Sequence, residues 1–380
     1  MPQTPRAWIE INKDHLKNNI KAIQTLLPPE TQYALVIKAN AYGHGMELIS
    51  QYCEQEQLVD LFCVAYLTEA LTLRAHGITK PILVMTYCDE DIHKAIMQAI
   101  DISIATFDGL LLVHTIAQQL NKKVHIHIKI DTGLSRFGFI PHQIEQLITI
   151  IKNTSHLTIC GIYSHFAQSN NTDQSYSDQQ RFLFKHIIAQ FFSAGIRPQY
   201  IHQQNSAGIM TQKDGLYNMV RVGALAYGLW SSPFQKELFE QESSKSIHQV
   251  LSFKSSIIDI KIIPQYTAIG YDCSFITQRK TITAKIPVGY ADGYFRYLGL
   301  KTNQAYVFIK NKYAPIIGYI AMNVITIDIT DIQEVVIGDE VTLIGDIPHI
   351  TANELAHTIG SGNPREITTL LNPTIKRVMI

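Results

Sequence analysis

The sequence predicts an α/β protein, with a (β/α)8 barrel followed by a C-terminal domain rich in β-strands. Two observations lead to this fold class. Short apolar runs alternate with helix-length segments from residue 34 to residue 222, and such alternation is typical of parallel sheets built from strand–helix units. Beyond residue 236 the alternation stops, and short strand-like runs follow one another. A doubly wound open sheet is the alternative that the same alternation allows.

Eight apolar runs are candidate barrel strands, because Val, Ile, Leu and Phe in continuous runs favour strands that are buried on both faces. The runs cover residues 34–37, 61–65, 82–85, 102–105, 124–130, 159–163, 200–202 and 219–222. Helical patterns, such as 14–27 and 179–192, accompany them. Eight strand–helix units favour the barrel over the open sheet, and a barrel carries its active site at the carboxyl ends of its strands.

The chain divides into two predicted domains, the barrel at residues 1–235 and the β-rich domain at residues 236–380. The stretch 235–249 is polar, which is typical of a connection between domains. In the second domain the predicted strands cover 257–263, 281–287, 306–309, 324–329 and 341–344, and one helix is predicted at 352–359. Pro, Gly, Asn and Asp bound these strands, as expected of turns between short strands.

The composition is that of an ordinary globular protein. Hydrophobic residues make up 46% of 380, and 32 basic residues balance 32 acidic ones, so the net charge favours neither nucleic acid nor an anionic membrane as a partner. The five cysteines are scattered without a C-x-x-C pair, which favours reduced thiols and a cytoplasmic location. We expect neither a signal peptide nor a membrane span, because no apolar segment is long enough.

Reactive side chains gather at one predicted end of the barrel. They are Lys38 after the first strand, Lys129 and Arg136 around the end of the fifth, Ser164 and His165 after the sixth, Asn205 and Ser206 after the seventh, and Arg221 and Gly223 at the eighth. Randomly placed polar residues would fall at both ends of the strands. The clustering therefore predicts a pocket at the carboxyl rim of the barrel.

Lys38 is a candidate for covalent chemistry. It ends an apolar run and precedes a Gly-rich segment, where the backbone can approach a ligand closely. At the mouth of a pocket an amine is partly desolvated, so its neutral form is favoured and it can form a Schiff base with a carbonyl such as that of pyridoxal phosphate. The alternative is a lysine at a strand end that only keeps a loop soluble.

A series of motifs carries a resemblance to a known family. They are the segments 36–45 (VIKANAYGHG), 129–136 (KIDTGLSR), 164–167 (SHFA), 205–207 (NSA), 220–223 (VRVG), 227–228 (YG), 270–271 (GY), 288–294 (VGYADGY) and the segment around Met322. In order and spacing the chain resembles the alanine racemases over nearly its whole length. The resemblance implies a barrel that binds pyridoxal 5'-phosphate, a β-strand domain, and a homodimer with shared active sites.

The resemblance also implies a two-base racemisation of alanine. Cleaving a Cα–H bond and reprotonating from the opposite side needs an acid/base group on each face of the planar carbanion. By resemblance, Lys38 carries the cofactor as an internal aldimine and is the base for the D-face. Tyr271 is the base for the L-face and reaches in from the partner subunit. Considered alone, Tyr271 would be interpreted as a half-buried tyrosine of a sheet.

Further roles around the cofactor follow from the same resemblance. Arg221 would face the pyridine nitrogen, where a permanent cation disfavours protonation of the ring. His165 would link Tyr271 and Arg221 through hydrogen bonds. The implied contacts to the rest of the cofactor are Tyr42, Asn205, Ser206 and the backbone at Gly223, whose hydroxyl and amide donors suit a phosphate. Without the family, a salt-bridged arginine and a core histidine are the simpler interpretations.

Arg136 and Met322 are the implied substrate contacts, Met322 through its backbone amide. In many family members the lysine at position 129 is carbamylated and the resulting anion orients the arginine, so Lys129 is a candidate for this modification. The alternation of His125 and His127 before Lys129 suggests a metal site, but a third ligand at suitable spacing is missing. No metal is therefore predicted.

Three positions depart from the family pattern. Asp272 stands where a glycine often follows the catalytic tyrosine, and Asn323 replaces the aspartate that usually follows the methionine. Arg365 occupies the position of a tyrosine that contacts phosphate and lines the inner gate. A guanidinium there can bind phosphate bidentately or attract a carboxylate, which would keep cofactor binding and shift the substrate preference.

The implied activity is interconversion of L- and D-alanine, which supplies D-alanine for cell-wall synthesis. Three alternatives remain: a racemase of serine or of a broader set of amino acids, a non-catalytic pyridoxal-phosphate-binding protein, and a barrel decarboxylase. A pure binding protein needs no second base, and the order of motifs matches racemases better than decarboxylases. The expected partners are a small amino acid and a second copy of the chain.

Overall fold

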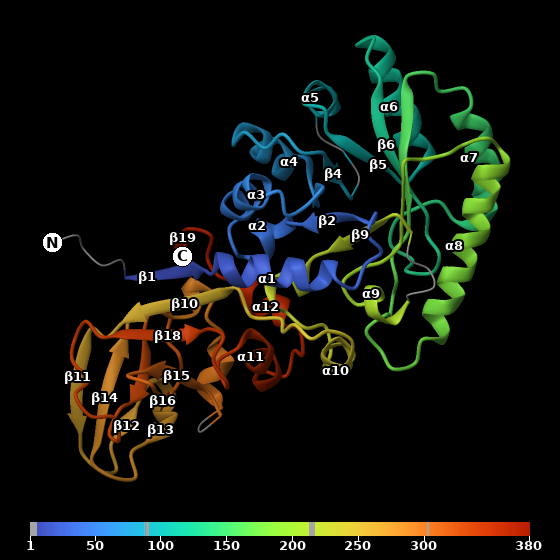
Figure 1. Cartoon of the computed structure of the whole chain (residues 1–380). Coiled ribbons are helices and arrows are strands. Elements are labelled where there is room, and N and C mark those ends of the chain that lie inside the picture. The colour runs from blue at the N-terminus through green and yellow to red at the C-terminus, as the bar shows by residue number, and fades with distance from the viewer. Residues whose placement is uncertain (1–5, 87, 89–90, 213–216, 302–303) are drawn as a thin grey trace.

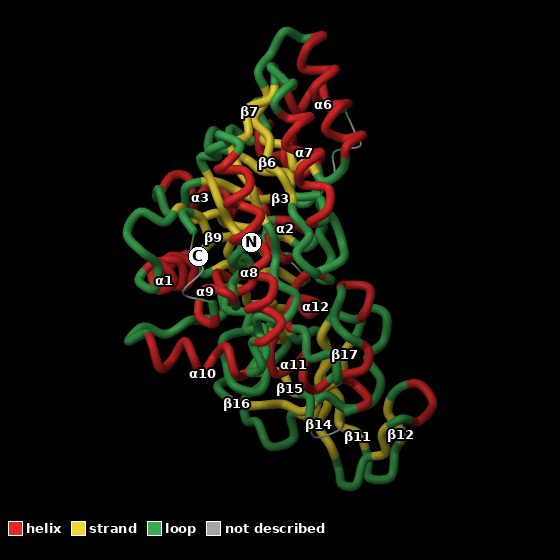
Figure 2. Tube along the Cα trace, turned by 90° about the vertical axis from the view of Figure 1, so that its right-hand side faces the viewer, coloured by secondary structure: helices red, strands yellow, loops and turns green. Residues whose placement is uncertain are grey.

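The structure is a computed structural model that describes residues 6–86, 88, 91–212, 217–301 and 304–380. It has two parts: in Figure 1 a barrel with outer helices runs from blue to yellow-green, and a strand-rich domain runs from yellow to red. Figure 2, at right angles to that view, shows helices around the barrel strands in the upper half. In the described segments no helix is long and apolar enough to cross a membrane.

Eight parallel strands form one sheet in the order β8-β7-β6-β5-β4-β3-β2-β9. They are β2 (Gln32–Val36), β3 (Leu61–Val64), β4 (Ile82–Val84), β5 (Asp101–Ile104), β6 (Val124–Lys129), β7 (Leu157–Tyr163), β8 (Tyr200–His202) and β9 (Met219–Val222). The Arg221 amide, which donates to the Gln204 carbonyl at 3.1 Å, bridges the seam between β8 and β9. The barrel is therefore nearly closed. The predicted barrel is confirmed, and the open-sheet alternative is wrong.

The barrel strands are continuous apolar runs because both of their faces are buried. In β2, Ala34 and Val36 belong to the same apolar cluster as Cys63 and Met219, whereas Leu35 belongs to the larger cluster shared with the outer helices. Successive residues of a strand point to opposite faces, so each strand contributes to both clusters. This explains why the runs lack the polar–apolar alternation of a half-exposed strand.

Helices connect the strands and cover the outside of the barrel. They are α1 (Lys13–Gln24), α2 (Lys38–Tyr42), α3 (Met46–Gln55), α4 (Leu67–Ala75), α5 (Ile92–Met97), α6 (Phe107–Gln119), α7 (Ile144–Ile151), α8 (Ser175–Ser193), α9 (Gly208–Thr211) and α10 (Pro233–Glu242). The predicted helix 14–27 corresponds to α1, which begins earlier, at Lys13, because the Asn12 side chain caps it by accepting from the Asp14 and His15 amides, and which ends earlier, at Gln24. The predicted helix 179–192 lies within α8.

The second domain is built on a six-stranded sheet of order β16-β15-β18-β10-β1-β19, beside sheets β11-β14-β17 and β12-β13. Its elements are β1 (Ala7–Ile11), β10 (Leu251–Ser256), β11 (Asp259–Ile263), β12 (Ala268–Ile269), β13 (Phe275–Ile276), β14 (Thr281–Ile286), β15 (Tyr306–Ile309), β16 (Lys312–Pro315), β17 (Ile325–Asp328), β18 (Glu340–Ile344), β19 (Lys376–Met379), α11 (Ala352–Thr358) and α12 (Pro364–Thr369). The blue strand β1 lies beside β10 in Figure 1. The N-terminal strand thus completes the sheet of the C-terminal domain.

One predicted strand is wrong in its start. The run 257–263 begins in the break between β10 and β11, because β10 ends at Ser256 and β11 begins at Asp259. Strand β10 escaped prediction because the buried inward position of Ser255 interrupts its apolar pattern. The predicted boundary between residues 235 and 236 lies inside α10, so the division at that point stays a prediction.

Helix α12 joins the second domain to the start of the barrel by packing against α2. A Cβ at Gly43 would lie 1.9 Å from the Thr368 carbonyl oxygen, and Arg377 Nε donates to the Gly43 carbonyl at 3.0 Å. Gly43 also has φ 86°, which glycine adopts at no steric cost. The contact places Arg365, on α12, next to the segment that begins with Lys38.

Candidate active site

A cavity of about 750 Å³ opens at the carboxyl end of the barrel strands. It brings together most of the site residues predicted from the sequence: Lys38, Tyr42, Lys129, Arg136, His165, Asn205, Ser206, Arg221, Gly223 and Arg365. Tyr271 and Met322 do not line it. They lie on the second domain with exposed fractions of 71% and 55%.

The segment labelled α2, which begins at Lys38, is a left-handed turn and not a right-handed α-helix. Residues Ala39 to Tyr42 all have φ between 52° and 55°, a conformation that costs roughly 1–2 kcal/mol per residue outside glycine. The Ala39 amide donates to the Glu69 carboxylate at 2.6 Å, and the Asn40 side chain accepts from the Met46 amide at 2.8 Å. We predicted a Gly-rich turn here, but four non-glycine residues adopt the left-handed conformation before Gly43 does. Backbone strain of this kind concentrates at functional sites.

Lys38 has the electrostatic environment of a reactive amine. Burial lowers its pKa, and the charges of Arg136 and Arg365 act in the same direction against the opposite influence of Glu69. A lower pKa increases the neutral fraction of the amine near neutral pH, and the neutral amine is the nucleophile in Schiff-base formation. The structure thus favours the covalent interpretation of Lys38 over that of a solubilising lysine.

Arg221 lies at the base of the site with 3% of its surface exposed. It donates to the Ser164 carbonyl at 2.7 Å, to the Gln203 carbonyl at 3.1 Å, to His202 Nδ1 at 2.5 Å and to His165 Nδ1 at 3.2 Å. Among the described residues no carboxylate forms an ion pair with it. A guanidinium donates only, so both histidines must present an unprotonated Nδ1. Burial and the charge of Arg221 lower the pKa of both rings well below the usual value.

Lys129 is buried in the same region, with 6% of its surface exposed. Burial lowers its pKa well below the usual value, and the charges of Arg221 and Arg136 add to the effect. Its Nζ lies 4.4 Å from the centre of the Tyr163 ring. The loop that carries Arg136 is held by the Asp131 carboxylate, which accepts from the Gly133 amide at 2.8 Å.

Tyr42, Ser206 and Gly223 form a set of donors suited to a phosphate. A Cβ at Gly223 would lie 2.4 Å from the Tyr42 hydroxyl, so only glycine allows the hydroxyl to occupy this place. The Gly223 amide contacts Ser206 Oγ at 3.1 Å. Burial raises the pKa of Tyr42 to about 12, although the charge of Arg365 acts against it, so the hydroxyl keeps its proton at neutral pH. Hydroxyl and amide donors around a glycine are typical of anion sites.

Sequence reasoning missed three residues that organise the site. Glu69 holds the turn after Lys38, and Tyr163 stacks on His202 with ring centres 4.8 Å apart. Tyr163 and His202 end predicted strands, so the rule that placed Lys38 at the rim would have found them. Glu69 lies in a helix, and its sequence neighbourhood gives no comparable signal.

The positions that depart from the family pattern have different surroundings. Asp272 has φ 57°, in the left-handed region that glycine favours and that Asp tolerates better than most residues. Arg365 lines the cavity, where its Nε donates to Asn363 Oδ1 at 2.6 Å. Asn323 is exposed beside Met322, and nothing in the structure explains the change at that position.

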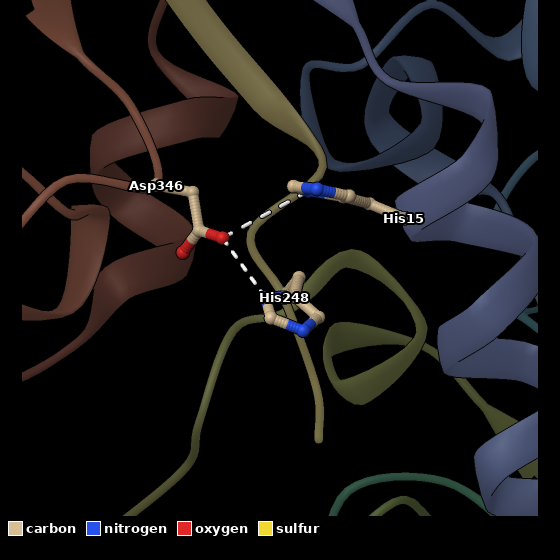
Figure 3. Close-up of side chains that lie close together, drawn as sticks. All are labelled: His15, His248 and Asp346. Atoms are coloured by element: carbon tan, nitrogen blue, oxygen red, sulfur yellow. Dashed lines mark hydrogen bonds and ion pairs between the residues drawn. The ribbon is translucent and has the colours of Figure 1, made fainter. Parts of the chain in front are cut away.

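One group of possible metal ligands lies close together among the described residues: His15, His248 and Asp346 (Figure 3). The Nδ1 atom of His248 already contacts Asp346 Oδ2 at 3.1 Å, and His15 Nδ1 contacts the backbone carbonyl of Gln249 at 2.9 Å. The hollow beside His248 is also lined by Lys21, whose charge disfavours a cation. We interpret the group as a polar link between α1 and the second domain.

The barrel, the rim lysine and the anion-binding donors define an enzyme of the type that holds a phosphate-bearing carbonyl cofactor on a lysine. Comparison with known proteins identifies the family. The family model "Alanine racemase, N-terminal domain" matches residues 11–231, and the model "Alanine racemase, C-terminal domain" matches residues 250–379. The chain therefore belongs to the alanine racemase family.

Individual alanine racemases are similar to this chain over nearly its full length. An alanine racemase of Methanococcus maripaludis is 35% identical over 98% of both chains, and alanine racemase 1 of Caldanaerobacter subterraneus subsp. tengcongensis is 33% identical over 97% of this chain and 94% of its own. The solved alanine racemase of Clostridium difficile 630 has a TM-score of 0.91 at 31% identity and covers 100% and 96% of the two chains.

The family depends on pyridoxal phosphate, and an alanine racemase from Bartonella henselae was solved with this cofactor covalently bound. That structure has a TM-score of 0.85 at 27% identity and covers 99% of this chain and 100% of its own. The residues of this chain fit the group: a half-buried amine at Lys38, a cation at Arg221, and a hydroxyl cradle whose space depends on Gly223. The predicted cofactor is thus confirmed.

Proposed function

We propose that the protein interconverts L- and D-alanine with pyridoxal phosphate bound at the rim of the barrel. The observation that carries the proposal is the cavity that unites a Lys38 amine of lowered pKa with the phosphate cradle and the buried Arg221. Bound pyridoxal phosphate supplies an electron sink that weakens the Cα–H bond of the substrate. The remaining work falls to side chains that hold the cofactor and move protons at that Cα.

Each site residue has a proposed role. Lys38 binds the cofactor covalently and then moves a proton at one face of the substrate Cα. Arg221 directs a permanent cation at the pyridine nitrogen, and Arg136 holds the substrate carboxylate. His165 and Asn205 line the cofactor site, which Tyr42, Ser206 and the Gly223 amide complete at the phosphate.

Tyr271 and Met322 fit this proposal only if they act in the site of a second copy of the chain. Both lie on the second domain and expose large parts of their side chains, while their own cavity is lined without them. A homodimer in which Tyr271 of each subunit completes the partner's cavity would bury them. Such a dimer, a cytoplasmic location and a supply of D-alanine for peptidoglycan synthesis stay predictions from the family.

The direct test follows proton exchange and stereochemistry together. The protein, loaded with pyridoxal phosphate, is incubated with L-alanine in D2O; the Cα proton is monitored by NMR and the enantiomers by chiral chromatography. We expect loss of the Cα proton and accumulation of D-alanine. Parallel reactions with L-serine and L-lysine measure the preference that Arg365 influences. Faster exchange of serine or lysine than of alanine would contradict the proposed substrate, and no exchange with any of them would contradict a racemase.

Replacing Gly223 by alanine should weaken cofactor binding. The added Cβ would lie 2.4 Å from the Tyr42 hydroxyl and displace it from the phosphate cradle. Loss of a hydrogen bond to a charged group predicts a rise of about 10- to 100-fold in the Kd for pyridoxal phosphate. Equilibrium dialysis in a Lys38→Ala background isolates the non-covalent contacts. Ser206→Ala removes one hydroxyl without moving Tyr42 and should have a smaller effect; an unchanged Kd for the Gly223 variant would remove the cradle from the proposal.

Lys129 is proposed to be carbamylated, as in many members of the family. Its pKa is lowered well below the usual value by burial and by two neighbouring arginines, which favours the neutral amine. The neutral amine can attack CO2, forming an N–C bond with release of one proton. The product places a negative charge between the cations. Equilibration with 13C-labelled CO2 should give one carbamate carbon signal in the NMR spectrum that is missing in Lys129→Ala. The same signal in that variant would assign the modification elsewhere.

A further inference from the structure

Behind the cofactor site, four barrel strands contribute to a series of buried polar groups, of which the proposed reaction uses only Arg221 directly. It runs from Arg221 on β9 to His202 on β8, His127 on β6 and Asp101 on β5. Arg221 Nη1 lies 2.5 Å from His202 Nδ1, His202 Nε2 lies 3.1 Å from His127 Nδ1, and His127 Nε2 lies 3.6 Å from Asp101 Oδ2. Both rings are fully buried, and Asp101 is buried as well.

The donors and acceptors of this chain have only one consistent order. Arg221 donates only, so His202 must accept at Nδ1 and carry its proton at Nε2. That proton is donated to His127 Nδ1, which leaves the proton of His127 on Nε2, facing Asp101. A carboxylate accepts only, and at 3.6 Å, which is longer than a hydrogen bond, Asp101 acts on this N–H as an opposite charge rather than as a bonded acceptor. The guanidinium and the carboxylate thus favour the same order from the two ends. Without the charge of Asp101 only the guanidinium would hold this order, so the reversed order, in which His202 presents an N–H to Arg221, would be less disfavoured.

The contact between the two histidine rings depends on one glycine of the barrel. Strand β7 lies between β6 and β8, and Gly161 on β7 pairs with His127. A Cβ at Gly161 would lie 2.2 Å from His127 Nδ1. The φ of Gly161 is not in the left-handed region, so the backbone does not require glycine there. The missing side chain instead lets His127 reach across β7 to His202.

Asp101 has the charge state that this series of polar groups needs. Burial would raise its pKa, but contacts with His125 and His127 outweigh this and keep the pKa below the usual value. The carboxylate is therefore ionised at neutral pH. Asp101 could have been the third ligand of the metal site that His125 and His127 suggested in the sequence. One nitrogen of His127 is instead used in the contact with His202. His125, whose side chain is 59% exposed, contacts Asp101 from the outer side.

We propose that Asp101 is a positioning residue for Arg221 and acts through His127 and His202. Its charge supports the tautomers that the guanidinium also favours, so that His202 keeps an acceptor toward Arg221. It also places a buried negative charge in the barrel that contains the buried Arg221. The consequence for catalysis rests on the proposed function, because it requires that Arg221 faces the cofactor. The order of the hydrogen bonds does not depend on that function.

Ring 15N NMR on the cofactor-loaded enzyme tests the chain directly, because the two nitrogens of a neutral imidazole differ strongly in shift according to which carries the proton. The His202 signals are assigned by their loss in His202→Gln. In the wild type we expect His202 and His127 as Nε2–H tautomers. In Asp101→Leu, which removes the charge in a side chain of similar shape, we expect the His202 signals to change to those of mixed tautomers, with part of the population as Nδ1–H.

Three further variants separate the chain from general damage. Asp101→Glu restores a carboxylate and should restore the tautomer at least in part. Gly161→Ala keeps Asp101 but displaces His127, and should alter His202 in the same way as Asp101→Leu. His125→Gln removes the other partner of Asp101 and should leave the His202 signals unchanged. All variants are first checked for folding by circular dichroism.

The second measurement is the rate of alanine racemisation. We expect kcat for alanine to fall by about 10- to 100-fold in Asp101→Leu, with a smaller change in KM, by analogy with metal sites, where loss of a residue that supports a ligand has an effect of this size. An Nδ1–H tautomer of His202 in the wild type, or an unchanged His202 spectrum in folded Asp101→Leu, would overturn the proposal. A wild type without racemisation would instead contradict the proposed function, and the tautomer result would still stand.

Discussion

Replacement of Lys38 by alanine is expected to reduce racemisation by more than about 10⁴-fold, because one change removes both the covalent anchor of the cofactor and a proton-transfer group. A half-buried amine of lowered pKa is what a covalent anchor needs. The absorbance of the lysine-bound cofactor in the near-visible range should disappear, while free pyridoxal phosphate still binds non-covalently. The two measurements are the absorption spectrum and the rate of D-alanine formation.

Lys122→Ala is the matched control, because Lys122 is an exposed lysine far from the cavity lining. It should keep both the spectrum and the rate. If Lys38→Ala kept the absorbance of the lysine-bound cofactor, another lysine would have to be the anchor, and Lys129 would be the first to examine because it lies in the same cavity.

The barrel and much of its site could be predicted because the relevant signals are local. A strand buried on both faces is a continuous apolar run, and the residue at its carboxyl end lies at the rim by the geometry of the fold. Lys38, His165 and Arg221 could be placed in one cavity on this basis alone. Their roles came from the resemblance to a family, since a buried arginine or histidine has several uses.

Other features depend on contacts between residues far apart in the chain. Strand β1 is short, and its place is decided by pairing with β10 and β19 at the other end of the sequence. Arg365 enters the cavity because α12 packs on α2. The sequence of neither segment predicts this packing. The contact from His127 to His202 crosses Gly161, so it requires the register of three strands. Local propensity carries no information about such pairings.

Replacement of Tyr271 by phenylalanine is expected to lower kcat by about 10²- to 10⁴-fold and to leave the bound-cofactor spectrum unchanged, because the change removes one acid/base hydroxyl and nothing that holds the cofactor. In the single chain Tyr271 is 71% exposed and outside the cavity. The control is Tyr266→Phe, a change at another exposed tyrosine of the second domain, and it should leave kcat unchanged. Full activity of Tyr271→Phe would remove this tyrosine from the mechanism.

Mixing two inactive variants distinguishes a shared site from one built within a single chain. If Tyr271 acts in the partner's cavity, a dimer of one Lys38→Ala and one Tyr271→Phe subunit has one cavity with both defects and one with neither. Random exchange of subunits at equal concentrations should therefore restore about one quarter of the wild-type rate, since about half of the dimers are mixed and each has one intact site of two. If each site used its own Tyr271, every cavity in the mixture would carry one defect and no activity would return. The recovered rate thus measures which subunit supplies the second base.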